Sequence, residues 1–153
     1  MSSHSARIEW KRTTPDFANP TYDRSYSIGF DDGITVPGTA ARANIPPTAP
    51  QAPGVDPEQA FVASLSSCHM LWFLYLACEK KFTVDRYADE AIGVLEKNRD
   101  GRMAMTRVTL RPRIAFGGKQ PPTPEQLQGL HEKAHALCFI ANSVLTEVLI
   151  EPQ

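Results

Sequence analysis

The chain has 153 residues, of which 42% are hydrophobic and 22% charged, and its formal net charge at pH 7 is −1. This length favours one domain with a core of its own, and the composition is ordinary for a soluble globular protein. Acidic and basic residues are mixed along the chain, so no basic stripe predicts a nucleic-acid partner and no acidic block predicts a solvated tail.

The N-terminal residues contain no apolar stretch, so we expect no signal peptide. Residues 59–78 carry no Asp, Glu, Lys or Arg and nominally reach membrane-spanning length. Polar residues such as Gln59, Ser66 and His69 interrupt this stretch, which favours a core helix and no membrane partner. The three cysteines are an odd number without an export signal, which argues against a disulfide framework and favours the cytoplasm.

Residues 6–36 are predicted to form strands. Tyr26, Ile28 and Phe30 alternate with small residues, the period of two that is typical of a strand. A tight-turn signal at residues 31–33 precedes a return strand at residues 34–36, which indicates a hairpin.

Residues 37–56 hold five prolines and are predicted to form an extended, exposed loop. A loop this long within a compact domain is often functional, and the alternative is a plain connector. A helix is then expected over residues 57–80, because Asp56 can cap it, Pro57 suits its first position and Gln59 completes a capping box. The helix is apolar nearly all round up to Cys78, which predicts that it runs through the centre of the protein.

Strands are expected over residues 84–115, one at 84–95 and another at 103–114, with a turn at residues 98–101. A second helix is expected over residues 124–139, because Thr123 and Gln126 repeat the cap pattern of the first helix. A closing strand is expected over residues 144–150. This order predicts a single α+β domain over residues 1–153, in which an antiparallel sheet packs on a buried central helix.

Cys68 and Cys138 lie in the two segments with the strongest helical, apolar character, 70 residues apart. They are either inert core residues or a redox couple that the fold brings together. Cys78 is ten residues from Cys68 on the same predicted helix, about 15 Å along its axis, which is too far for a disulfide. Cys138 is therefore the only possible intrachain partner of Cys68.

A buried mid-helix thiol needs help to react with a peroxide, because burial disfavours the thiolate and the helix dipole acts only within the terminal turns. A guanidinium suits this role, since its donors form a fixed planar fork, and a carboxylate can hold the guanidinium in place.

The segment from Pro57 to Phe61, with Cys68 ten residues after Glu58, resembles the signature of the osmotically inducible protein C / organic hydroperoxide resistance (OsmC/Ohr) family. Cys138, just before Ile140-Ala141-Asn142-Ser143-Val144, is similar in placement to the second cysteine of that family. The resemblance covers nearly the whole chain, from Tyr22 to Ile150. It implies an intertwined homodimer with two interface sites that reduces organic hydroperoxides.

By this resemblance Cys68 is the reactive cysteine, Cys138 the resolving cysteine and Glu58 the site carboxylate. Arg24 is the best match for the site arginine, and Arg42 is the alternative. An external dithiol of the lipoyl or thioredoxin type would reduce the disulfide, and no metal, flavin or haem cofactor is implied.

The chain also departs from the family pattern, since Phe139 stands where proline often follows the second cysteine, and His69 directly follows Cys68.

Two other functions fit the same residues. One is a non-enzymatic dimeric protein that binds apolar ligands or stores thiols on the same fold. The other is a zinc-binding module, because His131, His135 and Cys138 share one helical face and could bind a metal together with Cys68.

Overall fold

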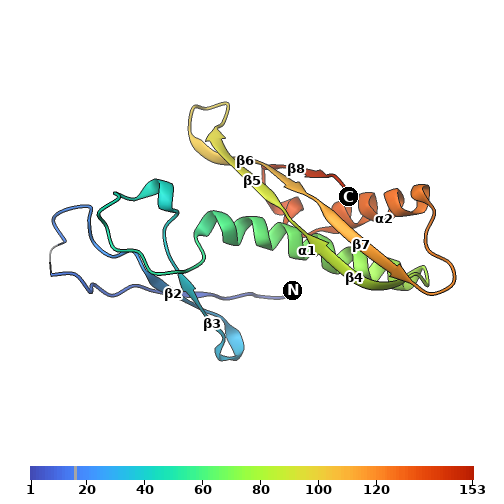
Figure 1. Ribbon diagram of the computed structural model, residues 1–153, viewed down its shortest axis with the longest axis horizontal. Helices are drawn as coiled ribbons and strands as arrows, with labels where there is room; N and C mark the ends of the chain where they lie inside the picture. Colours follow the sequence, from blue (N-terminus) through green and yellow to red (C-terminus); the bar gives the residue numbers. More distant parts are fainter. Residues whose placement is uncertain (16) are drawn as a thin grey trace. The chain divides into compact units, whose positions relative to one another are not determined.

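The computed structural model describes residues 1–15 and 17–153, which form two compact units, Met1–Ala60 and Phe61–Gln153. The first unit holds β1 (Arg7–Glu9), β2 (Tyr26–Gly29) and β3 (Thr35–Gly38) (Figure 1). A long helix, α1 (Pro57–Glu79), begins at the end of the first unit and continues into the second. The second unit also contains β4 (Thr83–Asp89), β5 (Ile92–Lys97), β6 (Met103–Leu110), β7 (Pro112–Gly117), α2 (Pro124–Leu137) and β8 (Glu147–Ile150).

The strands of the first unit form an antiparallel sheet in the order β1-β2-β3. The predicted hairpin is confirmed, with Phe30 N donating to Ile34 O over 2.9 Å. Asp32 and Gly33 make the turn with φ values of 64° and 76°, a conformation that Gly and Asp tolerate better than most residues.

The proline-rich loop is more ordered than the sequence predicts. Two hydrogen bonds close its base, one from Thr39 N to Val55 O (3.1 Å) and one from Val55 N to Pro37 O (2.9 Å). Ile45 and Ala49 are buried within the loop, so it folds back on itself instead of remaining exposed chain.

The cap predicted for α1 is confirmed at both of its hydrogen bonds. Gln59 N donates to Asp56 Oδ1 over 2.7 Å, and Asp56 N donates to Gln59 Oε1 over 3.2 Å. At the other end Lys81 has a φ of 65° and Phe82 N donates to Ala77 O, which is the left-handed termination that stops many helices.

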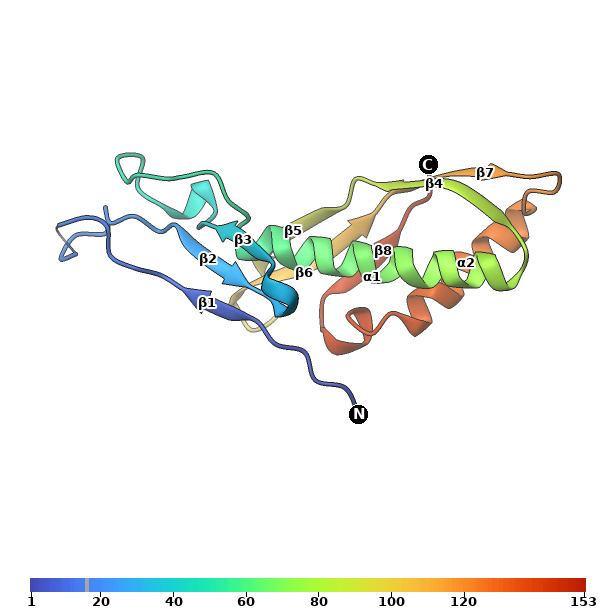
Figure 2. The ribbon, with the colours of Figure 1, turned by 90° about the horizontal axis from the view of Figure 1, so that it is seen from below.

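Helix α1 runs alongside the strands and α2 of the second unit (Figure 2). Two hydrophobic clusters lie along it. Leu65, in the first half of the helix, packs on Val108 and Leu110 of β6. Phe73, in the second half, packs with Leu130 and Ala134 of α2. The prediction of a buried central helix is confirmed only in part. Five residues of α1 are buried, namely Leu65, His69, Phe73, Leu76 and Ala77, whereas Leu71 and Tyr75 are exposed.

Among the described residues, α1 is the one helix long and apolar enough to cross a membrane by length and composition, a test that the core helix of a soluble protein also passes.

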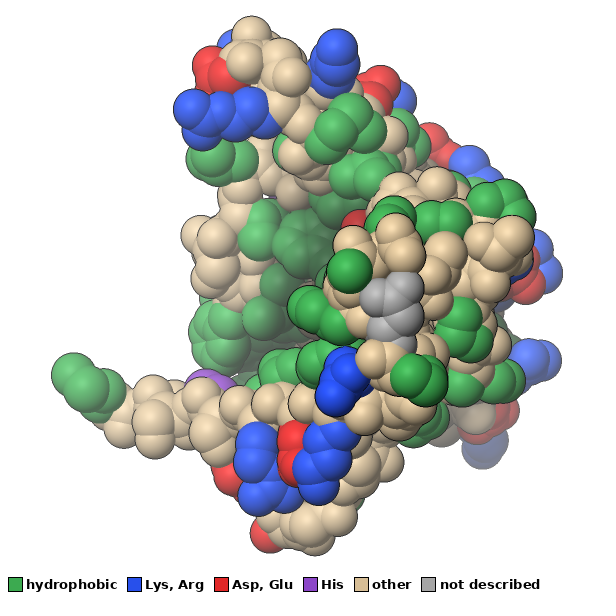
Figure 3. All heavy atoms as spheres, turned by 90° about the vertical axis from the view of Figure 1, so that its left-hand side faces the viewer, with side chains coloured by type: hydrophobic (Ala, Val, Ile, Leu, Met, Phe, Trp, Pro, Cys, Tyr) green, Lys and Arg blue, Asp and Glu red, His purple; other side chains and the backbone are tan. Residues whose placement is uncertain are grey.

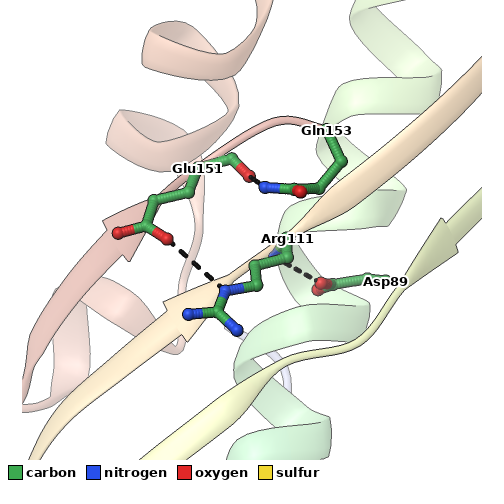
Figure 4. A network of polar contacts seen from close by, with 4 residues as sticks. All are labelled: Asp89, Arg111, Glu151 and Gln153. Carbon is green, nitrogen blue, oxygen red and sulfur yellow. Dashed lines mark hydrogen bonds and ion pairs between the residues drawn. The ribbon is translucent and has the colours of Figure 1, made fainter.

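The strands predicted at residues 84–95 and 103–114 are each broken in two. They form one long antiparallel ribbon, interrupted between the pairs Asp89↔Pro112 and Ile92↔Thr109. Pro112 has no N–H for a ladder bond, and the N–H of Arg111 donates instead to the Asp89 carboxylate over 2.6 Å (Figure 4).

The same carboxylate accepts a short hydrogen bond from Ser66 Oγ, so it fastens α1 to the ribbon two residues before Cys68. On the other side, Arg111 Nε pairs with Glu151 Oε2 over 3.4 Å, and Gln153 bonds the Glu151 carbonyl (Figure 4). This network connects the C-terminal segment to the break in the ribbon.

The α+β class is confirmed, and the single antiparallel sheet is replaced by three small sheets. β4 and β7 pair antiparallel, as do β5 and β6, but β8 adds to β6 in parallel. The parallel pairing arises because α2 and the turn after it return the chain to the starting end of β6. Helix α2 begins with the predicted capping box, in which Thr123 and Gln126 bond reciprocally.

Candidate functional site

Cys68 and Cys138 are brought together in the second unit, where their side chains interact with each other. Cys68 lies mid-way along α1 and is partly exposed, whereas Cys138 is buried, with 1% of its surface accessible. Helix α2 ends at Leu137, and Cys138 is its C-cap with extended backbone angles. Its sulfur also accepts a hydrogen bond from Ala141 N at 3.4 Å, so the turn after α2 fixes the position of this thiol.

The two thiols differ in their environments. Burial first, and then the hydrogen bond to the Cys68 side chain, raise the pKa of Cys138 to about 11, against opposing hydrogen bonds from the backbone N–H groups of Ala141 and Ile140. Cys138 is therefore protonated at neutral pH. The reachable sulfur is that of Cys68, which makes it the one able to meet an incoming electrophile first.

Cys78 is exposed and lies near the C-terminal end of α1, beyond Cys68. Since α1 is unbroken from Pro57 to Glu79, Cys78 is about 15 Å along the axis from Cys68. The structure thus excludes a disulfide between Cys68 and Cys78 of one chain, because the two residues are too far apart.

A buried histidine pair lies one residue beyond Cys68. His69 Nε2 and His131 Nδ1 are 3.1 Å apart, and both residues are at most 2% exposed. The ring planes differ by 4° and the centroids are 5.4 Å apart, so the rings meet through their nitrogens and not face to face. One neutral imidazole donates its N–H to the other.

Burial governs the charge of both histidines. It lowers the pKa of His69 to about 4, with further lowering from the nearby His131 and His135, and it lowers the pKa of His131 to about 4. His69 Nδ1, His131 Nε2 and His135 Nδ1 are buried without a hydrogen-bond partner.

The zinc site considered from the sequence finds no support in this arrangement. Within residues 1–15 and 17–153, no group of three or more His, Cys, Asp or Glu side chains is placed to hold a metal ion. Of the residues predicted as ligands, His131 instead bonds His69 through its Nδ1.

Arg24 and Glu58 lie in the first unit, where both line a cavity of about 440 Å³. Its wall includes the aromatic side chains of Trp10, Phe17 and Tyr22, whose ring centroids are 4.8–6.0 Å apart. The cavity combines a mostly apolar, aromatic lining with one cation and one carboxylate, which suits an apolar molecule that has one polar end.

Of the two candidate arginines, Arg24 is the one at the cavity. Its guanidinium lies 4.1 Å from the centroid of the Tyr22 ring, and Nη1 donates to Tyr22 O over 3.0 Å. Arg42 instead bonds Gln51 and the Pro47 carbonyl within the proline-rich loop. Between Arg24 and Glu58, both of them described residues, there is neither a hydrogen bond nor an ion pair.

Several features of the site were not predicted from the sequence. The only sequence signal for the aromatic cavity wall is the number of aromatic residues between positions 10 and 26, and these residues form no recognisable motif. The His69–His131 contact joins residues 62 positions apart, and a single sequence holds no signal for it.

Several known proteins resemble this chain in sequence or in fold. The model of the OsmC-like protein family matches residues 50–153. An OsmC-like protein of unknown function from Vibrio cholerae is 44% identical, with 100% of each chain covered and a TM-score of 0.96.

More distant matches share the fold. The organic hydroperoxide resistance protein OhrB of Bacillus subtilis is 20% identical, with 99% of this chain and 98% of that chain covered and a TM-score of 0.70. An organic hydroperoxide resistance protein from Elizabethkingia anophelis is 17% identical, with 99% and 94% covered and a TM-score of 0.70. No curated protein matches the chain.

The buried histidines predict a loss of stability in mild acid. Their pKa values are lower in the folded chain than the ordinary 6.5, so between about pH 6.5 and 4 the unfolded chain binds more protons. The free energy of unfolding should therefore fall as the pH drops through this window. One extra proton corresponds to a slope of about 1.4 kcal/mol per pH unit.

Urea unfolding of the parent and of a His69→Leu/His131→Leu variant at pH 4–7.5 measures this effect. The variant should have a shallower pH dependence, and a His4→Leu control, which removes an exposed imidazole, should match the parent. Identical slopes for the parent and the double variant would contradict the assignment.

Proposed function

Because the chain belongs to the OsmC-like family, we propose that it is a thiol peroxidase that reduces organic hydroperoxides to alcohols through Cys68 and Cys138. The observation that carries the proposal is the pair of interacting free thiols, one reachable and one buried and protonated. The names of the B. subtilis and E. anophelis proteins of this fold supply the substrate class.

The chemistry balances in two steps. The Cys68 thiolate attacks the terminal oxygen of the hydroperoxide, the O–O bond breaks, and the alkoxide takes a proton and leaves as an alcohol. Cys68 becomes a sulfenic acid. The Cys138 sulfur, on losing its proton, attacks the Cys68 sulfur, hydroxide leaves and takes up a proton as water, and a disulfide forms.

An external dithiol of the lipoyl or thioredoxin type then returns two electrons and two protons to the pair. The partly exposed Cys68 is the sulfur that such a reductant can reach, whereas Cys138 is buried. This cycle requires a compartment that keeps dithiols reduced, and we place it in the cytoplasm.

Arg24 and Glu58 take part from a second copy of the chain. Glu58 lies in the first turn of α1, and the helix continues unbroken to Cys68, about 15 Å farther along its axis. A chain of hydrogen bonds from carboxylate to guanidinium to thiolate spans only about 6–8 Å. A Glu58 that serves a thiolate through Arg24 must therefore serve that of a partner subunit.

The exposed apolar surface supports a homodimer. In the second unit, Leu71, Tyr75 and Phe139 are 63%, 55% and 68% exposed. In the first unit, large side chains such as Ile8 and Phe17 are also exposed. Hydrophobic side chains accordingly occupy broad areas of the surface in Figure 3. Surface of this kind is typical of a chain that is covered by a partner.

In the proposed dimer the aromatic cavity holds the organic part of the hydroperoxide, and Arg24 neutralises the departing alkoxide. Gly38 shapes this cavity, because a side chain there would overlap the ring of Tyr26, which lines it. The same cavity also supports a second candidate, a protein that binds apolar ligands without turning them over, which the assay below distinguishes.

Turnover of cumene hydroperoxide by the parent protein, with an excess of a dithiol reductant, tests the proposed chemistry. We expect consumption to be faster than that of hydrogen peroxide, since each buried methylene of substrate contributes about 0.8 kcal/mol to binding. Cys68→Ser should abolish turnover, and Cys78→Ser, which alters a thiol outside the pair, should leave it unchanged. Binding of the alcohol product without any turnover of hydroperoxide would instead establish the non-enzymatic function.

Mixing of two inactive variants tests the shared site. Cys68→Ser chains and Glu58→Ala chains should each be inactive alone, and refolding them together should restore activity, because a mixed dimer contains one intact site of two. The recovered activity should approach a quarter of the parent value for random pairing. A stable and fully active monomer in sedimentation would refute the arrangement.

A further inference from the structure

Two side-chain contacts join α1 to α2 and the residue that caps it. Cys68 meets Cys138, and the next residue, His69, meets His131. On the α2 side the two contacts are seven residues apart, which is two helical turns and about 10 Å of axis. A single contact would let α2 pivot about it, whereas two contacts at this spacing fix both the rotation and the slide of α2 relative to Cys68.

The thiol pair is sensitive to such movements. A disulfide requires Cβ atoms about 3.5–4.5 Å apart and a dihedral angle near 90°, and departures from these values make the bond easier to reduce. Cys138 caps the C-terminal end of α2, so a pivot of the helix would carry its sulfur away from Cys68.

The histidine pair is not explained by core packing. His131 lies against Phe73, with ring centroids 4.6 Å apart, inside the hydrophobic cluster that α1 forms with α2. Two apolar side chains would fill this space without leaving ring nitrogens unpartnered, an arrangement that costs stability. What the imidazoles add is direction, because a hydrogen bond fixes the distance and orientation of its two groups.

We propose that His69 and His131 are positioning residues for the thiol–disulfide step, whose hydrogen bond holds α2 where Cys138 can form a disulfide with Cys68. The inference rests on the proposed redox function of this thiol pair. It assigns to the histidines neither contact with the peroxide nor transfer of its proton. They act through the position of the Cys138 sulfur.

The equilibrium with dithiothreitol tests this without any peroxide. The protein dithiol and oxidised dithiothreitol exchange to give the protein disulfide and reduced dithiothreitol, and the constant is measured in a Cys78→Ser background by alkylation and mass spectrometry. Replacing both histidines, as His69→Leu/His131→Leu, leaves no unpartnered imidazole and guards against unfolding. We expect its constant to be about tenfold lower than the parent value, ~30 mV for this two-electron couple.

His131→Asn provides the conservative rescue, because the Asn amide reaches the place of the histidine Nδ1 that bonds His69. Its constant should return to within about threefold of the parent value, and that of the single His131→Leu variant should not. Lys133→Leu, an exposed change on the same helix, should have no effect.

A folded double-Leu variant with the parent constant, or an Asn variant as impaired as His131→Leu, would overturn the inference and leave the peroxidase proposal standing. If the double-Leu variant has a lowered constant but the parent turns over no hydroperoxide, the inference stands and the peroxidase proposal is overturned. A parent that forms no Cys68–Cys138 disulfide with any oxidant would overturn both.

Discussion

The contact between the Cys68 and Cys138 sulfurs depends on how α1 is held, and most of the second unit serves that purpose. The helix is apolar on all sides, so it is stable only where other elements cover it. Its first half packs on β6 and its second half on α2, and Asp89 fastens it to the ribbon close to Cys68. The turn after α2 then presents the sulfur of Cys138 from the opposite side.

Burial divides the chemical roles between neighbouring groups. It keeps Cys138 protonated and both histidines neutral at physiological pH, so the interior near Cys68 carries hydrogen-bonding groups without net charge. In the first unit, Arg24 and Glu58, the cation and carboxylate of the proposed mechanism, line an aromatic cavity.

Much of this structure could be predicted from local signals, and the remainder depends on contacts between distant residues. The capping residues Asp56 and Thr123 marked the starts of both helices, because a cap acts within four residues. The break in the long ribbon was missed, since it depends on the Asp89 carboxylate replacing a ladder acceptor at Arg111. The parallel addition of β8 was also missed, because it depends on the pairing of β6 with a segment far along the chain. Cys68 and Cys138 stood out in the sequence itself, whereas Arg24 and Glu58 came from a family resemblance, which supplied no hint of the buried His69–His131 pair.

The central claim is that Cys68 and Cys138 of one chain form a disulfide during reaction with an organic hydroperoxide. Mass spectrometry of protein treated with one equivalent of cumene hydroperoxide and digested without reductant measures this directly. The account predicts a peptide pair that joins Cys68 to Cys138 within one chain, in an isotope-mixed sample that distinguishes links within a chain from links between chains. Cys68 joined only to Cys78, or to a second chain, would contradict it.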